Sequence, residues 1–384
     1  MKKKIALVRG PNLNNWEMQN FNPLRDEFEL VGFTSYGHNF RVSEIPFEVK
    51  KLLSVGQTLR ARALRSIMSA FVGDYHDLVG LGRALKDFDV VHSAETAYYC
   101  TYQAAQVRAN ERWKLVVTVW ENIPFLYHAP RMLRNKRKIF SNADLFLATS
   151  NRAREVLILE GAPEEKVHVQ FPGVDTNHFA PRKRQTDLLG GFGCQPDDTI
   201  VLFVGNLSKQ KGVFDLLYAF HHVLRQTGPS KRMRLLIAGK GPEHDAMKRL
   251  IGNLRIEPYV TFLGSRSYSE MPAIHNLADI FVLPSIPVPR WQEQFGYVLV
   301  ESMACGKAVI STTSGSIPEV VGKAGVLVAP NDFVSLGHAI AELAGDRNKL
   351  ARLGKRARSR VQTLFNAQHV SEQMRGHYQS VLAR

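Results

Sequence analysis

The stretch that decides the fold is residues 284–306, PSIPVPRWQEQFGYVLVESMACG. The apolar run 278–283 before it predicts a buried strand that ends at a proline. After Gly296 no helix-breaking residue occurs until Gly306, where a glycine that ends a helix is expected. We therefore predict a strand, a proline-rich loop and the start of a helix. The unpaired amides and positive dipole end of that helix would bind a phosphate or another anion.

Two carboxylates flank the predicted anion site. Glu293 lies in the loop just before the helix, and Glu301 lies in its second turn. This placement suits a ligand with a diphosphate in the middle and hydroxyl groups at both ends, since carboxylates accept hydrogen bonds from hydroxyl groups. The alternative is that both are ordinary surface carboxylates.

The two glutamates, with seven residues between them that include Phe295-Gly296, resemble the E-x7-E signature of retaining nucleotide-sugar glycosyltransferases, most closely those of family 4. Residues 203–212 (FVGNLSKQKG) and 311–320 (STTSGSIPEV) resemble two neighbouring blocks of that family. The resemblance is strong over 201–332 and weak in the first half of the chain. It implies the α/β fold called GT-B, in which two doubly wound Rossmann-like domains face each other across a cleft.

The order of elements agrees with that fold, because apolar strand candidates alternate with helical stretches, as in parallel sheets. The candidates are residues 5–8, 90–92, 115–119, 145–148, 167–170, 200–204, 234–238, 260–263, 280–283, 308–310 and 325–328. The composition shift near 175–198 predicts a domain boundary. With the resemblance, we predict an acceptor-binding domain at 1–178, a donor-binding domain at 179–366, and a helix at 367–384 that crosses back to the first domain.

The resemblance implies that the reaction transfers a hexosyl group from a UDP- or GDP-sugar to an acceptor hydroxyl without a metal or other cofactor. Catalytic roles fall to Glu293 and Lys211, whose ammonium group would act on the diphosphate as a point charge. The donor-binding residues carried over are Gly205, Asn206, Lys211, Gly239, Arg266, Glu293, Phe295, Gly296, Tyr297 and Glu301. The family usually has an arginine where this chain has Asn206, so one positive charge on the leaving group is missing.

Acceptor contacts are expected where loops follow the strands of the first domain. The candidates are Gly10, Asn12, Trp16, Trp120, Glu121 and His128. Two departures from the family occur here: Gly10 stands alone where many members have two glycines, and Trp120 stands where many have a histidine. Either Glu121 or His128 takes over the histidine's contacts, or this chain does without them. A polar surface turn is the alternative for residues 10–16.

Composition limits the partners. The chain has 384 residues, 45% of them hydrophobic, and a net charge of +15, which favours anionic partners. Three scattered cysteines and a four-residue apolar run after the initial lysines indicate a cytoplasmic protein without a disulfide framework or secretory signal. Residues 44–74 can be drawn as a basic amphipathic helix. Such a helix either packs its apolar stripe into the domain or lies on the inner face of an anionic membrane as a peripheral contact. Membrane contact would make a lipid-linked acceptor an alternative to a glycan or small-molecule acceptor.

Other functions remain open at this stage. A sugar-nucleotide epimerase or a phosphorylase could use the same fold, and a phosphorylase would need pyridoxal phosphate. A non-catalytic basic protein that binds nucleic acid or membrane is a further alternative. Nucleic-acid binding is disfavoured because no RNA-binding aromatic motif, zinc finger or basic zipper is present in the sequence.

Overall fold

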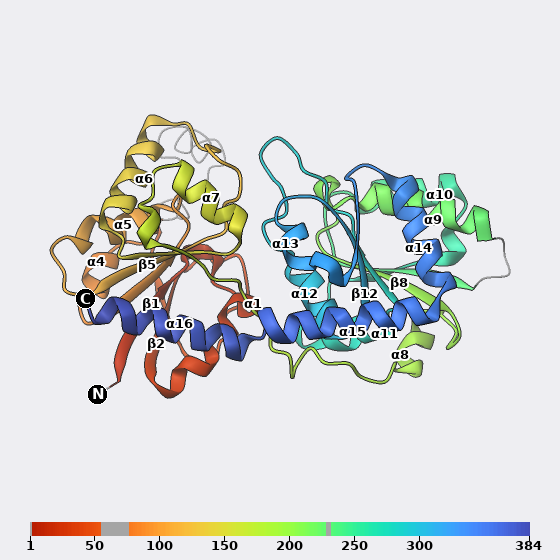
Figure 1. Cartoon of the computed structure of the whole chain (residues 1–384), viewed down its shortest axis with the longest axis horizontal. Coiled ribbons are helices and arrows are strands. Elements are labelled where there is room, and N and C mark those ends of the chain that lie inside the picture. The colour runs from red at the N-terminus through yellow and green to blue at the C-terminus, as the bar shows by residue number, and fades with distance from the viewer. Residues whose placement is uncertain (1, 55–76, 228–231) are drawn as a thin grey trace. The chain divides into compact units, whose positions relative to one another are not determined.

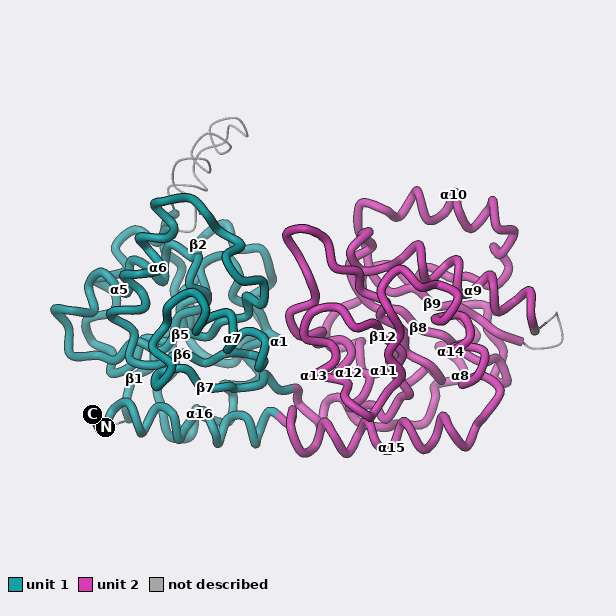
Figure 2. The backbone as a smooth tube through the Cα atoms, turned by 45° about the horizontal axis from the view of Figure 1, so that its top comes forward, with its two compact units in different colours: residues 1–173, 367–384 teal, residues 174–366 magenta. Residues whose placement is uncertain are grey.

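The computed structural model describes residues 2–54, 77–227 and 232–384, which form two compact units (Figure 2). Unit 1 contains Met1–Gly173 and Ala367–Arg384, and unit 2 contains Val174–Asn366. The division after Gly173 lies slightly before the boundary that we placed after residue 178. Each unit contains its own parallel sheet covered by helices (Figure 1).

The sheet of unit 1 has seven strands in the order β3-β2-β1-β4-β5-β6-β7, all paired in parallel. The strands are β1 Lys3–Val8, β2 Phe28–Ser35, β3 Glu48–Leu52, β4 Val90–Ala94, β5 Lys114–Val119, β6 Leu145–Ala148 and β7 Val167–Val169. Alternate side chains of β1 belong to two separate apolar clusters. Ile5 and Leu7 lie in one cluster, and Ala6 and Val8 lie in the other. Both faces of the sheet are therefore buried, as a doubly wound fold requires.

The helices of unit 1 follow its strands and cover both faces of the sheet (Figure 1). They are α1 Asn15–Met18, α4 Leu81–Ala84, α5 Tyr99–Arg108, α6 Pro130–Asn142, α7 Asn151–Leu159 and α16 Ala367–Leu382. The last of these is anchored by Tyr378, whose hydroxyl lies 2.6 Å from Nδ1 of His92. Nε2 of His92 lies 2.6 Å from Oγ1 of Thr118, so this buried histidine is satisfied within the fold.

The sheet of unit 2 has six parallel strands in the order β10-β9-β8-β11-β12-β13. The strands are β8 Thr199–Val204, β9 Met233–Ala238, β10 Val260–Gly264, β11 Ile280–Leu283, β12 Ala308–Thr312 and β13 Val326–Val328. The strand order reverses between β8 and β11, and ligands of open α/β sheets bind at such a switch point, outside the carboxyl ends of the strands. The predicted doubly wound α/β class is thus confirmed.

The helices of unit 2 connect these strands and cover the sheet. They are α8 Thr186–Gly191, α9 Val213–Thr227, α10 His244–Leu254, α11 Met271–Leu277, α12 Tyr297–Ala304, α13 Ile317–Val321, α14 Phe333–Gly345 and α15 Arg347–Leu364. Helix α12 occupies the predicted position after Gly296 and ends just before Gly306.

Two strands of unit 1 are absent from the sequence prediction, and one predicted helix is wrong in part. Residues 28–35 and 48–52 form β2 and β3, whereas 44–74 was drawn as one basic amphipathic helix. Lys50 and Lys51 are exposed on the edge strand β3, where lysine is a common protection against edge-to-edge pairing. Residues 48–52 form a strand because they pair with β2, and this tertiary pairing outweighs the helical periodicity of the local sequence. The remainder, from residue 55 on, lies outside the described residues.

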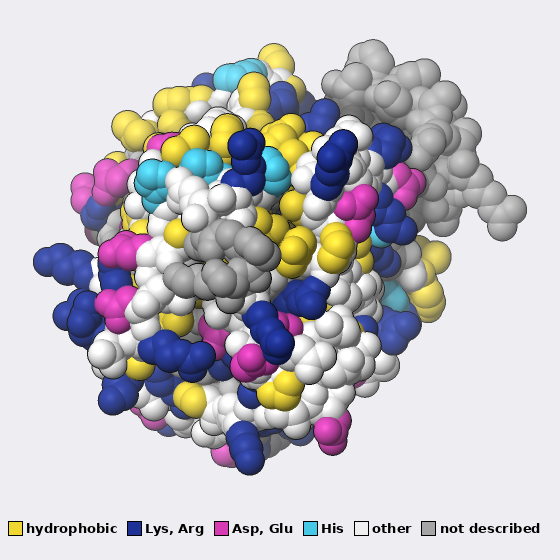
Figure 3. All heavy atoms as spheres, turned by 90° about the vertical axis from the view of Figure 1, so that its right-hand side faces the viewer, with side chains coloured by type: hydrophobic (Ala, Val, Ile, Leu, Met, Phe, Trp, Pro, Cys, Tyr) yellow, Lys and Arg dark blue, Asp and Glu magenta, His cyan; other side chains and the backbone are white. Residues whose placement is uncertain are grey.

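The basic charge is dispersed over the face seen in Figure 3, where Lys and Arg side chains alternate with acidic and hydrophobic ones. Several cations of unit 2 are paired, for example Arg232 with Asp197 and Lys349 with Glu342. Among the described residues no helix combines the length and the apolar character that a membrane span needs. The cysteines Cys100, Cys194 and Cys305 are buried free thiols.

Candidate functional site

Two loops meet at the switch point of unit 2, one after β8 and one after β11. Nζ of Lys211, from the first loop, lies 2.6 Å from Oε2 of Glu293 in the second, and the Ser285 hydroxyl donates to the same oxygen at 2.8 Å. The Glu293 side chain is 8% exposed and that of Lys211 21%, so the carboxylate is buried while the ammonium keeps contact with solvent. Nζ also lies 4.7 Å from the centre of the Trp291 ring, a cation–π contact. The two residues predicted to be catalytic are thus in direct contact.

Glycines set the spacing of these loops. A Cβ on Gly212 would lie 1.8 Å from the carbonyl oxygen of Pro284, and one on Gly315 would lie 2.0 Å from that of Glu293. Both glycines have positive φ values, +68° and +55°. The Ser316 amide donates to the Glu293 carbonyl at 2.9 Å. Close backbone contact with Gly315 and Ser316 therefore fixes the position of Glu293, and the contact with Gly212 fixes the start of the same loop at Pro284. Only glycine allows the approach at positions 212 and 315.

The start of α12 lies directly after Glu293. Gly296 precedes the helix in a left-handed conformation (φ 82°, ψ 61°) and provides no capping side chain. Phe295 is buried and packs edge-to-face on Phe365 at a ring distance of 5.5 Å, and Tyr297 lies 5.3 Å from Phe295. An uncapped helix start that follows Glu293, the partner of the Lys211 ammonium group, has the features of an anion site.

Glu301 lies deeper on α12 than Glu293. Its side chain is 5% exposed, and Oε2 lies 3.5 Å from Nε2 of the fully buried His275 on α11. That distance exceeds the 2.7–3.2 Å of an N–H···O hydrogen bond. Lys211 and Ser285 therefore both donate to Glu293, whereas Glu301 faces the His275 ring at a longer distance. The described structure gives no direct contact between the two glutamates.

The other predicted donor-binding residues lie on neighbouring loops of unit 2. A Cβ on Gly239 would lie 1.9 Å from the carbonyl oxygen of Gly205, so the loops after β8 and β9 are in close backbone contact. Asn206 is exposed at the same place. Arg266 follows β10, lies 5.4 Å from the Phe192 ring and pairs with Glu270 at 3.4 Å. No contact recorded for Arg266 involves Lys211, Glu293 or Glu301.

The predicted acceptor residues after β1 form a polar turn in unit 1. Gly10 begins a short 3-10 helix, 10–12, with φ 54°. Asn12 donates to the Tyr98 hydroxyl at 3.0 Å and accepts from the Asn39 amide at 2.9 Å. Trp16 is half-buried and packs edge-to-face on Phe40 at 4.7 Å. These contacts tie the turn to neighbouring residues of unit 1, and its role in binding the acceptor stays a prediction.

The segment after β5 contains the other three predicted acceptor-binding residues. Trp120 is half-buried, Glu121 is buried, and its Oε1 accepts from the Ile123 amide at 2.9 Å. His128 is exposed.

The sequence prediction missed Glu95, which follows β4 beside the switch point of unit 1. Oε1 of Glu95 accepts from the Trp120 amide at 2.9 Å. The residue is buried, with a left-handed φ of 61° that is unusual outside glycine. Burial, together with the charge of nearby Glu121, raises the pKa of Glu95 to about 8. A carboxyl group that stays protonated near neutral pH can donate a hydrogen bond as well as accept one.

The pKa of Glu95 predicts a pH effect on stability. Between about pH 4.5 and pH 8 the folded protein keeps a proton on Glu95 that the unfolded chain releases. The contribution of Glu95 to the free energy of unfolding therefore falls as pH rises through this window and levels off above it. We expect Glu95→Gln to be increasingly more stable than wild type from pH 5 to pH 8.5, measured by urea unfolding. A difference between the two proteins that is constant with pH would contradict the assignment.

Two family models match the chain. The family described as Glycosyl transferases group 1 matches residues 190–360, and Glycosyltransferase Family 4 matches residues 43–178. Together they cover both units, and the range matched by the first model includes Lys211, Glu293 and Glu301. The chain belongs to the family 4 glycosyltransferases.

Relatives of this family 4 member include enzymes called D-inositol 3-phosphate glycosyltransferase. One from Nocardia farcinica is 30% identical over 256 residues, or 64% of this chain and 55% of the relative. One from Mycobacterium tuberculosis is 29% identical over 304 residues, or 74% of this chain and 58% of the relative. The chain thus spans a little over half the length of the curated relatives it matches.

Solved structures with the same fold include Anabaena HepE in complex with UDP, with a TM-score of 0.79, 21% identity, and coverage of 98% of this chain and all of that one. Sucrose-phosphate synthase from Thermosynechococcus elongatus has a TM-score of 0.76 at 21% identity and covers both chains completely. The predicted two-domain Rossmann-like GT-B fold is therefore confirmed.

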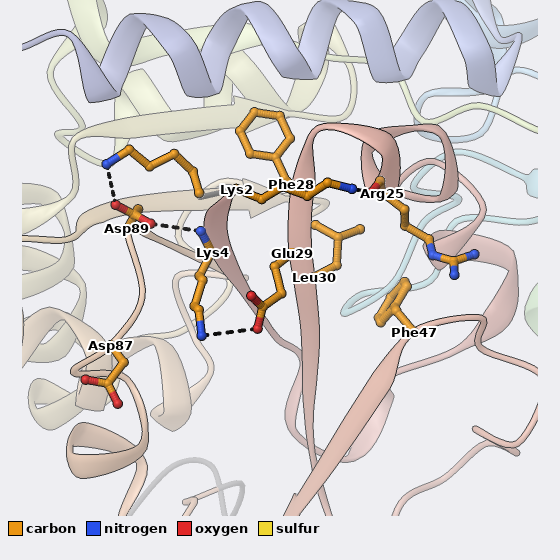
Figure 4. Close-up of a pocket in the computed structure, with 10 residues that line it drawn as sticks. Lys2, Lys4, Arg25, Phe28, Glu29, Leu30, Phe47, Asp87 and Asp89 are labelled. Carbon is orange, nitrogen blue, oxygen red and sulfur yellow. Dashed lines mark hydrogen bonds and ion pairs between the residues drawn. The ribbon is translucent and has the colours of Figure 1, made fainter.

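A hollow of about 710 Å³ lies at the opposite edge of the unit 1 sheet from the residues after β1 and β4, at the start of β1 (Figure 4). Its lysines are engaged: Lys2 donates to the Arg25 carbonyl, Lys3 pairs with Asp89 and Lys4 pairs with Glu29. Ligands of open α/β sheets bind at the other edge, so this hollow is not the candidate site of the family 4 member. Across the described ranges, no group of three or more His, Cys, Asp or Glu residues could hold a metal ion.

Proposed function

We propose that the protein transfers a hexosyl group from a nucleoside diphosphate sugar to an acceptor hydroxyl with retention of the anomeric configuration. The observation that carries this is the contact of Lys211 with Glu293, 2.6 Å apart, at the uncapped start of α12. The UDP and UDP-glucose complexes of HepE favour a uridine nucleotide as donor.

In the proposed reaction the bond between the sugar C1 and the diphosphate oxygen breaks, and its electron pair leaves with the diphosphate. The acceptor oxygen forms a new bond to C1 on the same face, and its proton passes to the departing phosphate oxygen. Lys211 and the first amides of α12 stabilise the charge that grows on the diphosphate. Glu293 and Glu301 accept hydrogen bonds from the donor sugar and from the ribose, respectively, about 1.5–3 kcal/mol for each bond to a charged group.

In the proposed reaction the salt bridge between Lys211 and Glu293 orients the carboxylate before the donor binds. Lys211 holds the buried Glu293 carboxylate, whose second hydrogen bond from Ser285 does not depend on the lysine. When a diphosphate takes the ammonium group, Ser285 keeps Glu293 in place, and a carboxylate has further lone pairs for sugar hydroxyls.

We propose that no divalent metal ion is needed, because Lys211 and the helix start supply the positive charge. Initial rates of transfer are therefore expected to agree within about twofold in EDTA and in Mg²⁺ or Mn²⁺. A loss of activity in EDTA that a divalent metal restores would refute metal independence without affecting the assignment as a transferase.

For the acceptor we propose a hydroxylated glycan, lipid-linked or small molecule bound by unit 1, at the residues after β1, β4 and β5. The acceptor of the named relatives, D-inositol 3-phosphate, is the first to test.

The function is tested by thermal-shift screening with UDP-, GDP- and ADP-sugars and the free nucleotides, since a ligand that binds the folded state raises Tm. The best donor is then incubated with a panel of acceptors, and the product's anomeric configuration is read by NMR. A retained configuration is expected. Donor conversion without an acceptor would favour an epimerase. An absorbance band of bound pyridoxal phosphate would favour a phosphorylase. Salt-sensitive DNA binding with no nucleotide affinity would favour a non-catalytic binding protein.

A further inference from the structure

His275 is a fully buried histidine without a hydrogen bond. It lies on α11, and neither of its ring nitrogens has a hydrogen-bond partner. The ring packs against Phe179 and Phe281, at centre distances of 5.9 and 5.5 Å. Buried polar groups nearly always have a partner, so an unpaired imidazole among aromatic rings requires an explanation.

The Glu301 carboxylate lies close to this ring, with Oε2 3.5 Å from Nε2 of His275. The side chains come from neighbouring helices, since α11 packs against α12. The gap is a few tenths of an ångström longer than an N–H···O bond, and a small rotation of Glu301 closes it.

Glu301 itself is less constrained than Glu293. Two donors, Lys211 and Ser285, fix one oxygen of Glu293, whereas the recorded polar contact of the Glu301 side chain is His275. A carboxylate that is to accept two hydroxyl groups side by side must have its plane fixed. An N–H donor on one of its oxygens does this and leaves the other oxygen available.

We propose that His275 is a positioning residue that holds the Glu301 carboxylate, through Nε2–H, in the orientation that binds the vicinal ribose hydroxyls of the donor nucleotide. The inference rests on the proposed function, because it names the residue that makes Glu301 selective for a ribose diol. The bond requires the Nε2–H form of the ring and leaves Nδ1 facing the aromatic side chains.

The test compares two substitutions of His275. His275→Phe keeps a buried ring but has no donor, whereas the amide nitrogen of His275→Gln can reach the place of Nε2. Binding of UDP and of 2′,3′-dideoxy-UDP is measured by calorimetry for each protein, or the GDP pair if GDP binds more tightly. His338→Phe, an exposed position on α14, is the control.

In wild type and His338→Phe we expect a preference for the ribonucleotide of roughly tenfold to a hundredfold, as for a hydrogen bond to a charged group. The preference should fall below about threefold in His275→Phe and return in His275→Gln, with a change in donor KM larger than the change in kcat. A folded His275→Phe protein that keeps the wild-type preference would overturn the positioning role and leave the proposed function standing. A wild type that binds none of these nucleotides would overturn both.

A second measurement does not depend on the stability of the phenylalanine variant. The ¹⁵N spectrum of the histidine side chains, with His275 assigned from its loss in His275→Gln, reports which ring nitrogen is protonated. With UDP bound we expect Nε2 of His275 to carry the proton. An Nδ1–H ring with bare Nε2 in the complex would refute the inference.

Discussion

Replacing Lys211 with alanine is expected to lower kcat/KM for glycosyl transfer by about a hundredfold to a thousandfold, the usual effect of removing one preorganised charge-stabilising group. The ammonium group lies 2.6 Å from Glu293, which precedes α12 in the chain, and the proposed diphosphate departs at this site. The effect should appear mainly in kcat, because the charge on the diphosphate grows in the transition state. Steady-state kinetics with the donor from the screen measure it.

The control is Lys248→Ala, which removes an exposed lysine from α10 in the same unit. It changes the net charge equally and should keep activity within about twofold. Because Lys211→Ala also leaves the buried Glu293 with one partner fewer, Tm must be measured for both proteins. A folded Lys211→Ala enzyme with wild-type rates would contradict the role of Lys211.

Gly315→Ala is expected to damage both stability and activity. The new Cβ would lie 2.0 Å from the carbonyl oxygen of Glu293, and φ at this position is +55°. The left-handed conformation alone costs roughly 1–2 kcal/mol for a non-glycine residue, so we expect the free energy of unfolding to fall by about 2 kcal/mol or more. Relief of the clash moves the Glu293 backbone, and a shift of about 1 Å near the reacting groups can lower the rate about a hundredfold.

Gly376→Ala is the matched substitution. This glycine is exposed within α16, has no atom within 4 Å of the added Cβ, and lacks a positive φ. Alanine should stabilise the helix by about 0.5–1 kcal/mol and leave the rate unchanged. The free energy of unfolding in urea and the steady-state rate of transfer are measured for both variants. Equal effects of the two substitutions would show that the contact between Gly315 and Glu293 does not fix the site.

The sequence predicts the loops of unit 2 well because they follow strands that are apolar throughout, and because glycine and proline mark where each strand ends. Lys211 and Glu293 come from two loops separated by 82 residues in the chain. Their contact follows from the strand order, in which β8 and β11 are neighbours. Periodicity alone does not give that order. The resemblance to a family supplied it.

Unit 1 was harder to predict for physical reasons. Glu29 and Gly32 divide the apolar residues of β2 into short pieces, and the short edge strand β3 exposes both of its lysines and has no apolar run. Glu95 gave no signal, because its left-handed backbone and raised pKa come from tertiary surroundings. His275 stands in an ordinary apolar helix pattern, and only coordinates reveal that its ring nitrogens have no partner.

The most direct test of the account is a crystal structure of the protein with UDP or the donor chosen by the screen. We expect the diphosphate within hydrogen-bond distance of Lys211 Nζ and of the first amides of α12, with the ribose hydroxyls on Glu301 and the sugar hydroxyls on Glu293. A nucleotide bound elsewhere, with Lys211 still paired to Glu293 and Glu301 free of ligand, would contradict it.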